Sequence, residues 1–215
     1  APVACWRVER RDGAIHVREK ATMAQRPATS NSQAADAAAR MVIIGGGAAG
    51  YAAAQMLRRK GFAGSVLIIS ADQAGPYGRP NLSKDYLAGE ASADWIPLAD
   101  DQYYATQKIE LRLGVTATAI DPSRHIVALD DGTSVNYSKL LIATGAEPIR
   151  LAVPGADLPH VQVLRSLADS GRIIARATRG SRAVIVGASF IGLEAAAALR
   201  HRGVEVHVVA PETRP

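Results

Sequence analysis

Two glycine-rich stretches of the chain have the composition and spacing that suit the binding of nucleotide phosphates. The first, VIIGGGAAG at residues 42–50, places Gly45, Gly47 and Gly50 in the pattern G-x-G-x-x-G. Between a strand and a helix, such glycines allow a tight turn, close approach of the backbone to a pyrophosphate, and close helix packing. A glycine-rich turn without a ligand is the alternative, because this pattern on its own is weak evidence.

The second stretch, GASFIG at residues 187–192, varies the same pattern. It keeps Gly187 and Gly192 and has Ser189 where the middle glycine is expected. A hydroxymethyl group narrows the approach of a phosphate, but the hydroxyl can also donate a hydrogen bond to it. Two such stretches in one chain predict two dinucleotide sites.

An acidic residue after the second strand of such a unit accepts hydrogen bonds from a ribose hydroxyl. Asp72 has this place after the first stretch, with a solvated loop aspartate as the alternative. After the second stretch the sequence is VVAPE, with Ala210 where the acid is expected and Glu212 two positions later. Either Glu212 binds the ribose or the site discriminates weakly between NAD and NADP.

Composition restricts the redox chemistry that the chain can perform. Cys5 is the only cysteine, which excludes an internal disulfide and a C-x-x-C pair, and the five histidines have no metal-ligand spacing, so no metal site is predicted. Redox chemistry must therefore use a bound cofactor. No apolar run is long enough to span a bilayer and no signal peptide opens the sequence, so a cytoplasmic location is expected.

Hydrophobic periodicity predicts the elements that position these glycines. Apolar runs at 41–44 and 65–70 flank an Ala-rich helical segment that ends at Gly61, which indicates a βαβ unit. Residues 182–209 repeat that order. Short β-like runs over 110–145 indicate a β-meander whose last strand returns to the first sheet. The fold class is therefore α/β with parallel sheets.

The N-terminal region has a different pattern. Residues 3–20 alternate apolar and polar positions around Asp12-Gly13, which predicts a β-hairpin with a type I′ turn, and residues 21–40 have the composition of a linker. Because a lone hairpin is marginally stable, we expect the chain to begin inside a domain whose remainder is absent. The net charge of +5 comes without interleaved aromatic residues, so it predicts a solvated basic surface and no nucleic-acid partner.

Three ordered motifs resemble a known family. YGRPNLSKDYLAG (77–89), LLIATGAEP (140–148) and VIVGASFIGLEAA (184–196) resemble FAD-dependent pyridine nucleotide-disulfide oxidoreductases of the ferredoxin reductase and apoptosis-inducing-factor-like branch. The resemblance covers about residues 41–215 and implies a glutathione-reductase-like fold truncated at its C-terminus. It has two Rossmann-like units with an intervening β-meander. Residues 1–20 are similar to the last strands of a Rieske domain, without the cluster-binding motifs.

The resemblance also implies domains and site residues. Residues 41–150 would be the first part of an FAD-binding domain and residues 151–215 the first part of an NAD(P)-binding domain. Lys84 would approach the flavin ring and pair with Glu194 as catalytic residues, and Arg79 would lie over the FAD phosphates. The predicted cofactor-binding residues are Gly45, Gly47, Ala48, Ala49, Gly50, Asp72, Arg79, Lys84, Ala143, Thr144, Gly145, Gly187, Ser189, Phe190, Ile191, Gly192, Glu194 and Glu212. The alternatives are a solvent-facing Lys84 and a Glu194 that complements the helix dipole.

The implied activity is transfer of a hydride from NAD(P)H to FAD, followed by transfer of electrons to an iron–sulfur protein such as a ferredoxin or a Rieske-type protein. The region after the second strand has no cysteine pair, so a thiol relay is excluded. No arginine cluster directly follows Glu212, which favours NAD, although Arg214 leaves NADP open. The chain is expected to be a fragment of a longer reductase, with a 2Fe-2S cluster only in the parent protein and no membrane partner. The alternative is an NADH-sensing flavoprotein that acts through binding.

Overall fold

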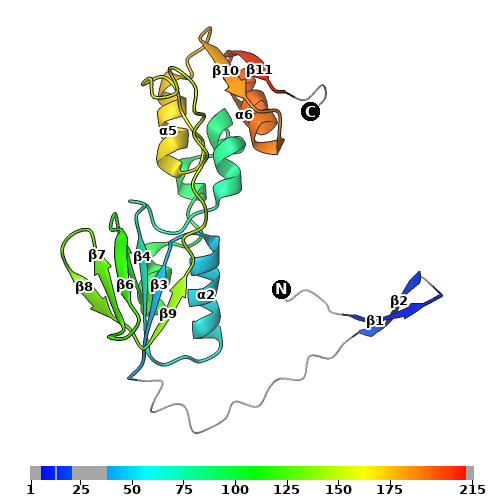
Figure 1. Cartoon of the computed structure of the whole chain (residues 1–215). Coiled ribbons are helices and arrows are strands. Elements are labelled where there is room, and N and C mark those ends of the chain that lie inside the picture. The colour runs from blue at the N-terminus through cyan, green and yellow to red at the C-terminus, as the bar shows by residue number, and fades with distance from the viewer. Residues whose placement is uncertain (1–5, 13, 21–37, 212–215) are drawn as a thin grey trace. The chain divides into compact units, whose positions relative to one another are not determined.

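The computed structural model describes residues 6–12, 14–20 and 38–211, and the chain separates into two compact units, residues 1–33 and residues 34–215. The first unit is the predicted hairpin (Figure 1), in which strands β1 (Trp6–Arg11) and β2 (Ala14–Lys20) pair antiparallel. Its origin in a Rieske-like domain stays a prediction, and most of the predicted linker lies outside the described residues.

The turn and one ion pair of the hairpin agree with its sequence. Asp12 has φ of 52°, the positive value that a type I′ turn requires at its first central residue. Across the strands, Arg18 Nη2 lies 2.6 Å from Glu9 Oε2. Both side chains are about half exposed, so this pair contributes little to stability.

The second unit is built on a parallel four-stranded sheet. Its strand order is β5-β4-β3-β9, with β3 at Arg40–Ile44, β4 at Ser65–Ser70, β5 at Ile109–Leu113 and β9 at Lys139–Ile142. Helix α2 (Ala48–Arg59) forms the crossover from β3 to β4. The first predicted βαβ unit is therefore present, with Met41 beside Val66.

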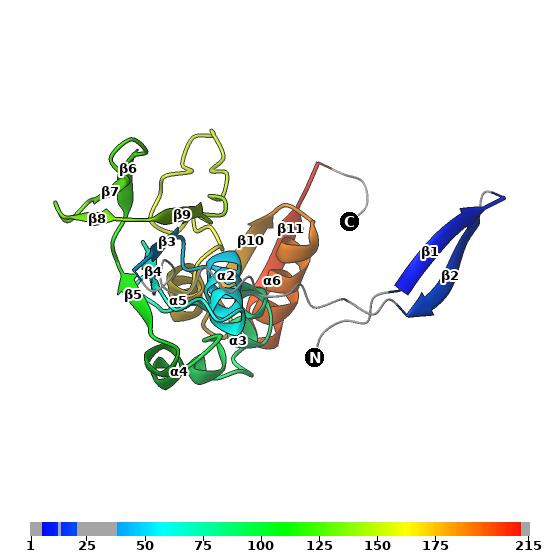
Figure 2. The same ribbon diagram turned by 90° about the horizontal axis from the view of Figure 1, so that it is seen from below.

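Both faces of the two central strands, β3 and β4, are covered, which explains why these two strands are continuous apolar runs. On one face, Val42 and Leu67 pack against Val127 and Val135 of a small antiparallel sheet. That sheet contains β6 (Ala117–Asp121), β7 (Ile126–Leu129) and β8 (Ser134–Asn136). On the other face, Ile43 packs with residues of α2 and of α4 (Asp101–Thr106). The parallel sheet therefore lies between the small antiparallel sheet and a layer of helices (Figure 2).

The prediction for residues 110–114 was wrong in one respect. These residues were placed in the β-meander, but β5 pairs parallel with β4 in the first sheet. The reason is helix α4, which the sequence pattern did not reveal and which makes β4 to β5 a second crossover connection. Asp100 caps this helix, because its side chain accepts a hydrogen bond from the Tyr103 amide at 2.7 Å.

The second predicted βαβ unit is also present. Strands β10 (Arg182–Val186) and β11 (Glu205–Val209) pair parallel across helix α6 (Phe190–His201). Helix α5 (Leu167–Arg176) precedes them and begins with a capping box formed by Ser166 and Asp169. The α/β fold class with two Rossmann-like units is confirmed.

The motif at residues 77–89 packs with the second βαβ unit. It contains the 3₁₀ helix η1 (Arg79–Ser83) and helix α3 (Asp85–Ala88), and a further 3₁₀ helix, η2 (Ala93–Trp95), follows. Leu87 is fully buried in a cluster that includes Ala195 and Leu199 of α6. The predicted domains place this motif before residue 150, and its helices η1 and α3 pack against α5 and α6. The domain boundaries stay predictions.

Membrane-spanning length is lacking in the helices that the structure describes, since none of them is long and apolar enough to cross a bilayer.

Candidate functional site

The first glycine-rich loop connects β3 to α2, and the backbone itself requires glycine at its two ends. Gly45 has φ of +118°, and a Cβ atom added to it would lie 2.2 Å from the Ala143 carbonyl oxygen. A Cβ atom on Gly50 would lie 2.0 Å from the carbonyl oxygen of Gly45. Both distances are far inside van der Waals contact, so any side chain at either position would displace backbone.

The middle of this loop is open. A Cβ atom added to Gly47 would have nothing within 4 Å, and Ala48 and Ala49 are exposed. The first amides of helix α2 lack partners in the preceding turn and point out of its N-terminus. The loop therefore offers unpaired N–H groups beside an unobstructed backbone, and this arrangement fits the pyrophosphate of a dinucleotide.

Residues Ala143, Thr144 and Gly145 follow β9 and border this loop, as predicted from their place in the sequence. The Ala143 amide donates to the Ile44 carbonyl at 2.8 Å, which extends the β3–β9 pairing up to Gly45. Thr144 and Gly145 are exposed beyond that point. Whether they contact a cofactor stays a prediction.

The second glycine-rich loop, between β10 and α6, has the same construction. Gly187 has φ of +110°, and a Cβ atom on Gly192 would lie 2.1 Å from the Gly187 carbonyl oxygen. Ser189 is the N-cap residue of α6, but its side chain makes no capping hydrogen bond. The hydroxyl is thus available to a ligand, and the neighbouring Phe190 and Ile191 are 87% and 55% exposed.

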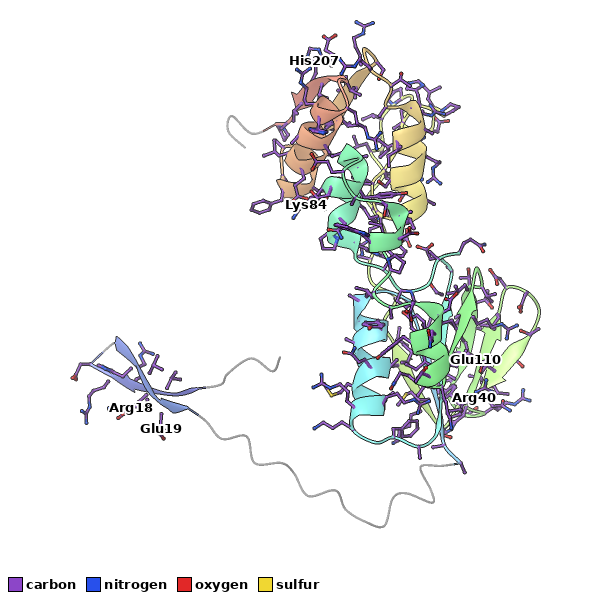
Figure 3. All side chains as sticks on the ribbon, turned by 180° about the vertical axis from the view of Figure 1, so that it is seen from behind. Arg18, Glu19, Arg40, Lys84, Glu110 and His207 are labelled. Carbon is purple, nitrogen blue, oxygen red and sulfur yellow. The ribbon has the colours of Figure 1, made fainter. Side chains whose placement is uncertain are left out.

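Lys84, which is labelled in Figure 3, directly precedes α3, and its side chain meets that of Glu194 in α6 although the two residues are far apart in the sequence. Lys84 Nζ lies 3.4 Å from Glu194 Oε1. The Ser83 hydroxyl donates a shorter hydrogen bond, 2.6 Å, to Glu194 Oε2. The Ser83 hydrogen bond, and secondarily Lys84, hold the pKa of the Glu194 carboxyl below its ordinary value. The sequence reasoning missed Ser83; its position next to Lys84 was the only signal.

Asp72 lies just beyond the end of β4, where the ribose-binding acid was predicted. Its Oδ1 accepts a hydrogen bond from the Ala74 amide at 3.3 Å, and its Oδ2 accepts one from the Tyr77 hydroxyl. Each carboxylate oxygen keeps a lone pair for a further donor. Asp72 can therefore accept a further hydrogen bond, such as one from a ribose hydroxyl. Tyr77 was not among the predicted site residues.

Two arginines line a small cavity beside η1. The cavity has a volume of about 60 Å³, and its lining includes Arg79, Arg165 and Ile191. Arg165 Nε donates to the Ala146 carbonyl at 3.1 Å, and neither arginine forms an ion pair with a carboxylate in the described part of the chain. Two cations without an acidic partner favour an anion. Arg165 was missed, and its only signal was the capping box that follows it.

Glu212, the candidate ribose acid of the second loop, lies outside the described residues. The second loop is therefore characterised by its glycines, Ser189 and the start of α6 alone.

Comparison of the chain with known proteins identifies its family. Residues 39–215 match the family described as pyridine nucleotide-disulphide oxidoreductase. The chain belongs to that family. The family agrees with the motifs at 77–89, 140–148 and 184–196, so the predicted resemblance, including the ferredoxin reductase branch, is confirmed.

Three proteins of known name are similar to this chain over about three quarters of its length. Rhodocoxin reductase of Rhodococcus erythropolis is 40% identical over 159 residues, which are 74% of this chain and 37% of that protein. Rubredoxin-NAD(+) reductase of Pseudomonas putida is 36% identical over 158 residues, 74% of this chain and 41% of that protein. The crystal structure of the ferredoxin reductase for the CYP199A2 system from Rhodopseudomonas palustris has a TM-score of 0.74 at 36% identity, covering 79% of this chain and 42% of the other. The present chain therefore spans well under half the length of each of these three relatives.

Proposed function

We propose that this family member is the part of an FAD-dependent NAD(P)H oxidoreductase that binds FAD at the first glycine-rich loop and NAD(P)H at the second. Bound FAD would supply the conversion of a two-electron hydride donor into single electrons for an iron–sulfur protein such as a ferredoxin or a Rieske-type protein. The relatives are named as reductases of rhodocoxin, rubredoxin and ferredoxin, which supports this class of acceptor.

One observation carries the proposal, namely the repeated geometry of the two loops. In each, the first glycine has a positive φ and the last glycine lies against its carbonyl oxygen. Each loop ends at a helix N-terminus whose side chains leave the amides uncovered, with Gly47 and Ser189 as the N-cap residues. Two such sites in one compact unit suit two dinucleotides that exchange a hydride.

At the first site, the chain's own groups have distinct proposed roles. The amides of Ala48, Ala49 and Gly50 would bind the pyrophosphate together with the helix dipole. Arg79 and Arg165 would neutralise its charge from the cavity beside η1. Asp72 would accept a hydrogen bond from the adenosine ribose.

Between the sites, Ser83 and Lys84 join the first motif to α6. Lys84 is 48% exposed, so its ammonium can contact an anionic ligand in addition to Glu194, which Ser83 also holds. A lysine near a flavin would stabilise negative charge on the reduced ring. We therefore propose Lys84 as a catalytic residue, with Glu194 fixing its position.

The second site is proposed to take NAD in preference to NADP. The relative from Pseudomonas putida is named for NAD(+), and no arginine cluster directly follows β11 in the sequence. Ser189 would donate a hydrogen bond to the NAD pyrophosphate. The cytoplasmic location stays a prediction from the sequence.

The proposal is tested by reconstituting the chain with FAD and recording its visible absorption before and after anaerobic NADH addition. We expect retained bands near roughly 370 and 450 nm that bleach with NADH. The matched control is Gly47→Ala, because a methyl group there meets no protein atom within 4 Å and would obstruct only a ligand. Equal FAD retention by the variant and the unmodified chain would contradict the assigned loop.

The acceptor step is tested separately, by adding a ferredoxin to the reconstituted chain with excess NADH. Sustained ferredoxin reduction supports the oxidoreductase. A reduced flavin that persists beside NAD⁺ without passing electrons on would support the alternative, an NADH-sensing flavoprotein of the apoptosis-inducing-factor-like type.

A further inference from the structure

The Tyr77 hydroxyl joins two segments that are distant in the sequence. Tyr77 is 5% exposed and lies two residues before the start of η1. Its hydroxyl donates a hydrogen bond to Asp72 Oδ2 and accepts one, 3.0 Å long, from the Leu167 amide. Leu167 is the first residue of α5. A single buried phenol therefore contacts both the predicted ribose acid, Asp72, and the first residue of helix α5.

These contacts define the orientation of the Asp72 carboxylate. Tyr77 supplies the donor to Oδ2, and the Ala74 amide supplies the donor to Oδ1. Without the hydroxyl, the carboxylate would have one remaining anchor and could rotate about its terminal torsion, which is broad for aspartate. The same loss would leave the Leu167 amide, in the first turn of α5, without an acceptor.

The hydroxyl remains a donor over the physiological range. Burial, and then the hydrogen bond to Asp72, raise the pKa of Tyr77 to about 12, so the phenol is protonated at neutral pH. A protonated phenol has one O–H to donate, and Asp72 is the acceptor that it uses.

We propose that Tyr77 is a positioning residue that orients Asp72 toward the adenosine ribose and couples occupancy of the first nucleotide site to the seating of α5. This inference rests on the proposed binding of FAD at the first loop. In this proposal the ribose 2′-hydroxyl donates a hydrogen bond to the Asp72 carboxylate, which also accepts the hydrogen bond of the Tyr77 hydroxyl. Ribose binding and the Tyr77–Leu167 contact then stabilise one another, because both need the same carboxylate orientation.

A second buried tyrosine provides the matched control. Tyr104 is also 5% exposed, and its hydroxyl has no hydrogen-bond partner among the residues that the structure describes. Replacing Tyr104 with Phe removes the same atom as replacing Tyr77 with Phe, but breaks no hydrogen bond. The two variants therefore separate the bridging contact from the general effect of losing a buried hydroxyl.

The test is a thermodynamic cycle with FAD and its 2′-deoxyadenosine analogue, measured by flavin fluorescence on the whole chain. We expect Tyr77→Phe to weaken FAD binding roughly ten-fold, as for loss of one charge-assisted contact, and to change binding of the analogue by less than about two-fold. Tyr104→Phe should change neither. Equal weakening of both ligands by Tyr77→Phe would show that Tyr77 supports the fold only, and would overturn the inference.

Failure of the proposed function gives a different result, because the unmodified chain would then bind neither flavin, and the inference would fail with it. If Tyr77→Phe does not fold, hydrogen exchange of the Leu167 amide in the unmodified chain decides the question. When each ligand is added separately at a saturating concentration, hydrogen exchange of the Leu167 amide should be at least about three-fold slower with FAD than with the analogue. Equal exchange rates would overturn the coupling.

Discussion

In the first glycine-rich loop, a Cβ atom on Gly50 would lie 2.0 Å from the Gly45 carbonyl oxygen, and in the second loop the equivalent distance from Gly192 to Gly187 is 2.1 Å. The middle position differs, because one loop has Gly47 and the other has Ser189. The chain folds both loops into the same backbone despite that difference. Thus the terminal glycines are required by the backbone, whereas the middle position of the first loop faces open space, where we propose that the ligand binds.

The largest expected effect comes from filling the space at a terminal glycine. Gly50→Ala should destabilise the chain by about 3 kcal/mol or more, because its methyl group would overlap the Gly45 carbonyl beside the fully buried Ile43. Gly192→Ala should cost less, since β10 and β11 are partly exposed and can shift. Thermal unfolding followed by circular dichroism measures both.

Gly75→Ala is the control for that series, as its methyl group would meet only Leu111 at an ordinary 3.7 Å. If Gly50→Ala unfolded at the temperature of this control, the close approach would not matter for the fold.

The next effect separates folding from binding within one loop. Gly47→Ala should weaken FAD binding at least roughly ten-fold and leave the melting temperature unchanged, because the added methyl group occupies ligand space alone. Ser189→Gly is its counterpart and should weaken NADH binding about three-fold, as for one lost neutral hydrogen bond. Titration calorimetry provides both affinities, and a joint loss of stability and affinity in Gly47→Ala would contradict the distinction.

Alkaline pH should break the contacts of the Tyr77 hydroxyl with Asp72 and with the Leu167 amide. A raised pKa means that the protonated phenol is favoured in the folded state, so its contribution is complete below about pH 10 and is lost as the pH rises towards 12. The melting temperature of the unmodified chain should fall over this interval more steeply than that of Tyr77→Phe. Parallel pH profiles would show that Tyr77 titrates as an ordinary exposed tyrosine.

The smallest expected effect concerns Glu194. Ser83→Ala should raise the pKa of the Glu194 carboxyl towards its ordinary value more than Lys84→Gln does, because the Ser83 hydrogen bond is the larger cause of the depression. A depressed carboxyl pKa stabilises the fold above the ordinary pKa, and this contribution is lost as the pH falls. Carbon-13 NMR titration of Glu194 measures the shifts. A larger shift in Lys84→Gln would assign the main role to the ion pair.

Sequence patterns were sufficient for features formed within one βαβ unit. Apolar runs flanking the glycines predicted β3, β4, β10 and β11. The runs of β3 and β4 are mostly buried, as parallel strands covered on both faces require, whereas β10 and β11 are partly exposed. The pattern failed at β5, where the short helix α4 lacks a sustained apolar period and the strand resembles one of a meander.

The pair Lys84 and Glu194 was predicted only through family resemblance, and the structure brings the two within 3.4 Å. Ser83 and Arg165 were not predicted, because a hydroxyl or a guanidinium carries no signal of its partner until the chain has folded. Ser83 and Glu194 are separated by 111 positions, and a local pattern cannot report a contact over that distance.

The sequence by itself determined which segments form strand, helix and strand and where the glycines of each turn stand, since apolar periodicity and the positive φ of Gly45 and Gly187 are local properties of the chain. The tertiary structure decided which polar groups meet. Tyr77 and Leu167 are 90 positions apart, and only the packing of η1 and α3 against α5 and α6 brings the hydroxyl to the amide. Hydrogen bonds act over about 3 Å, so side chains this far apart in the sequence become partners only when the packed helices place them together.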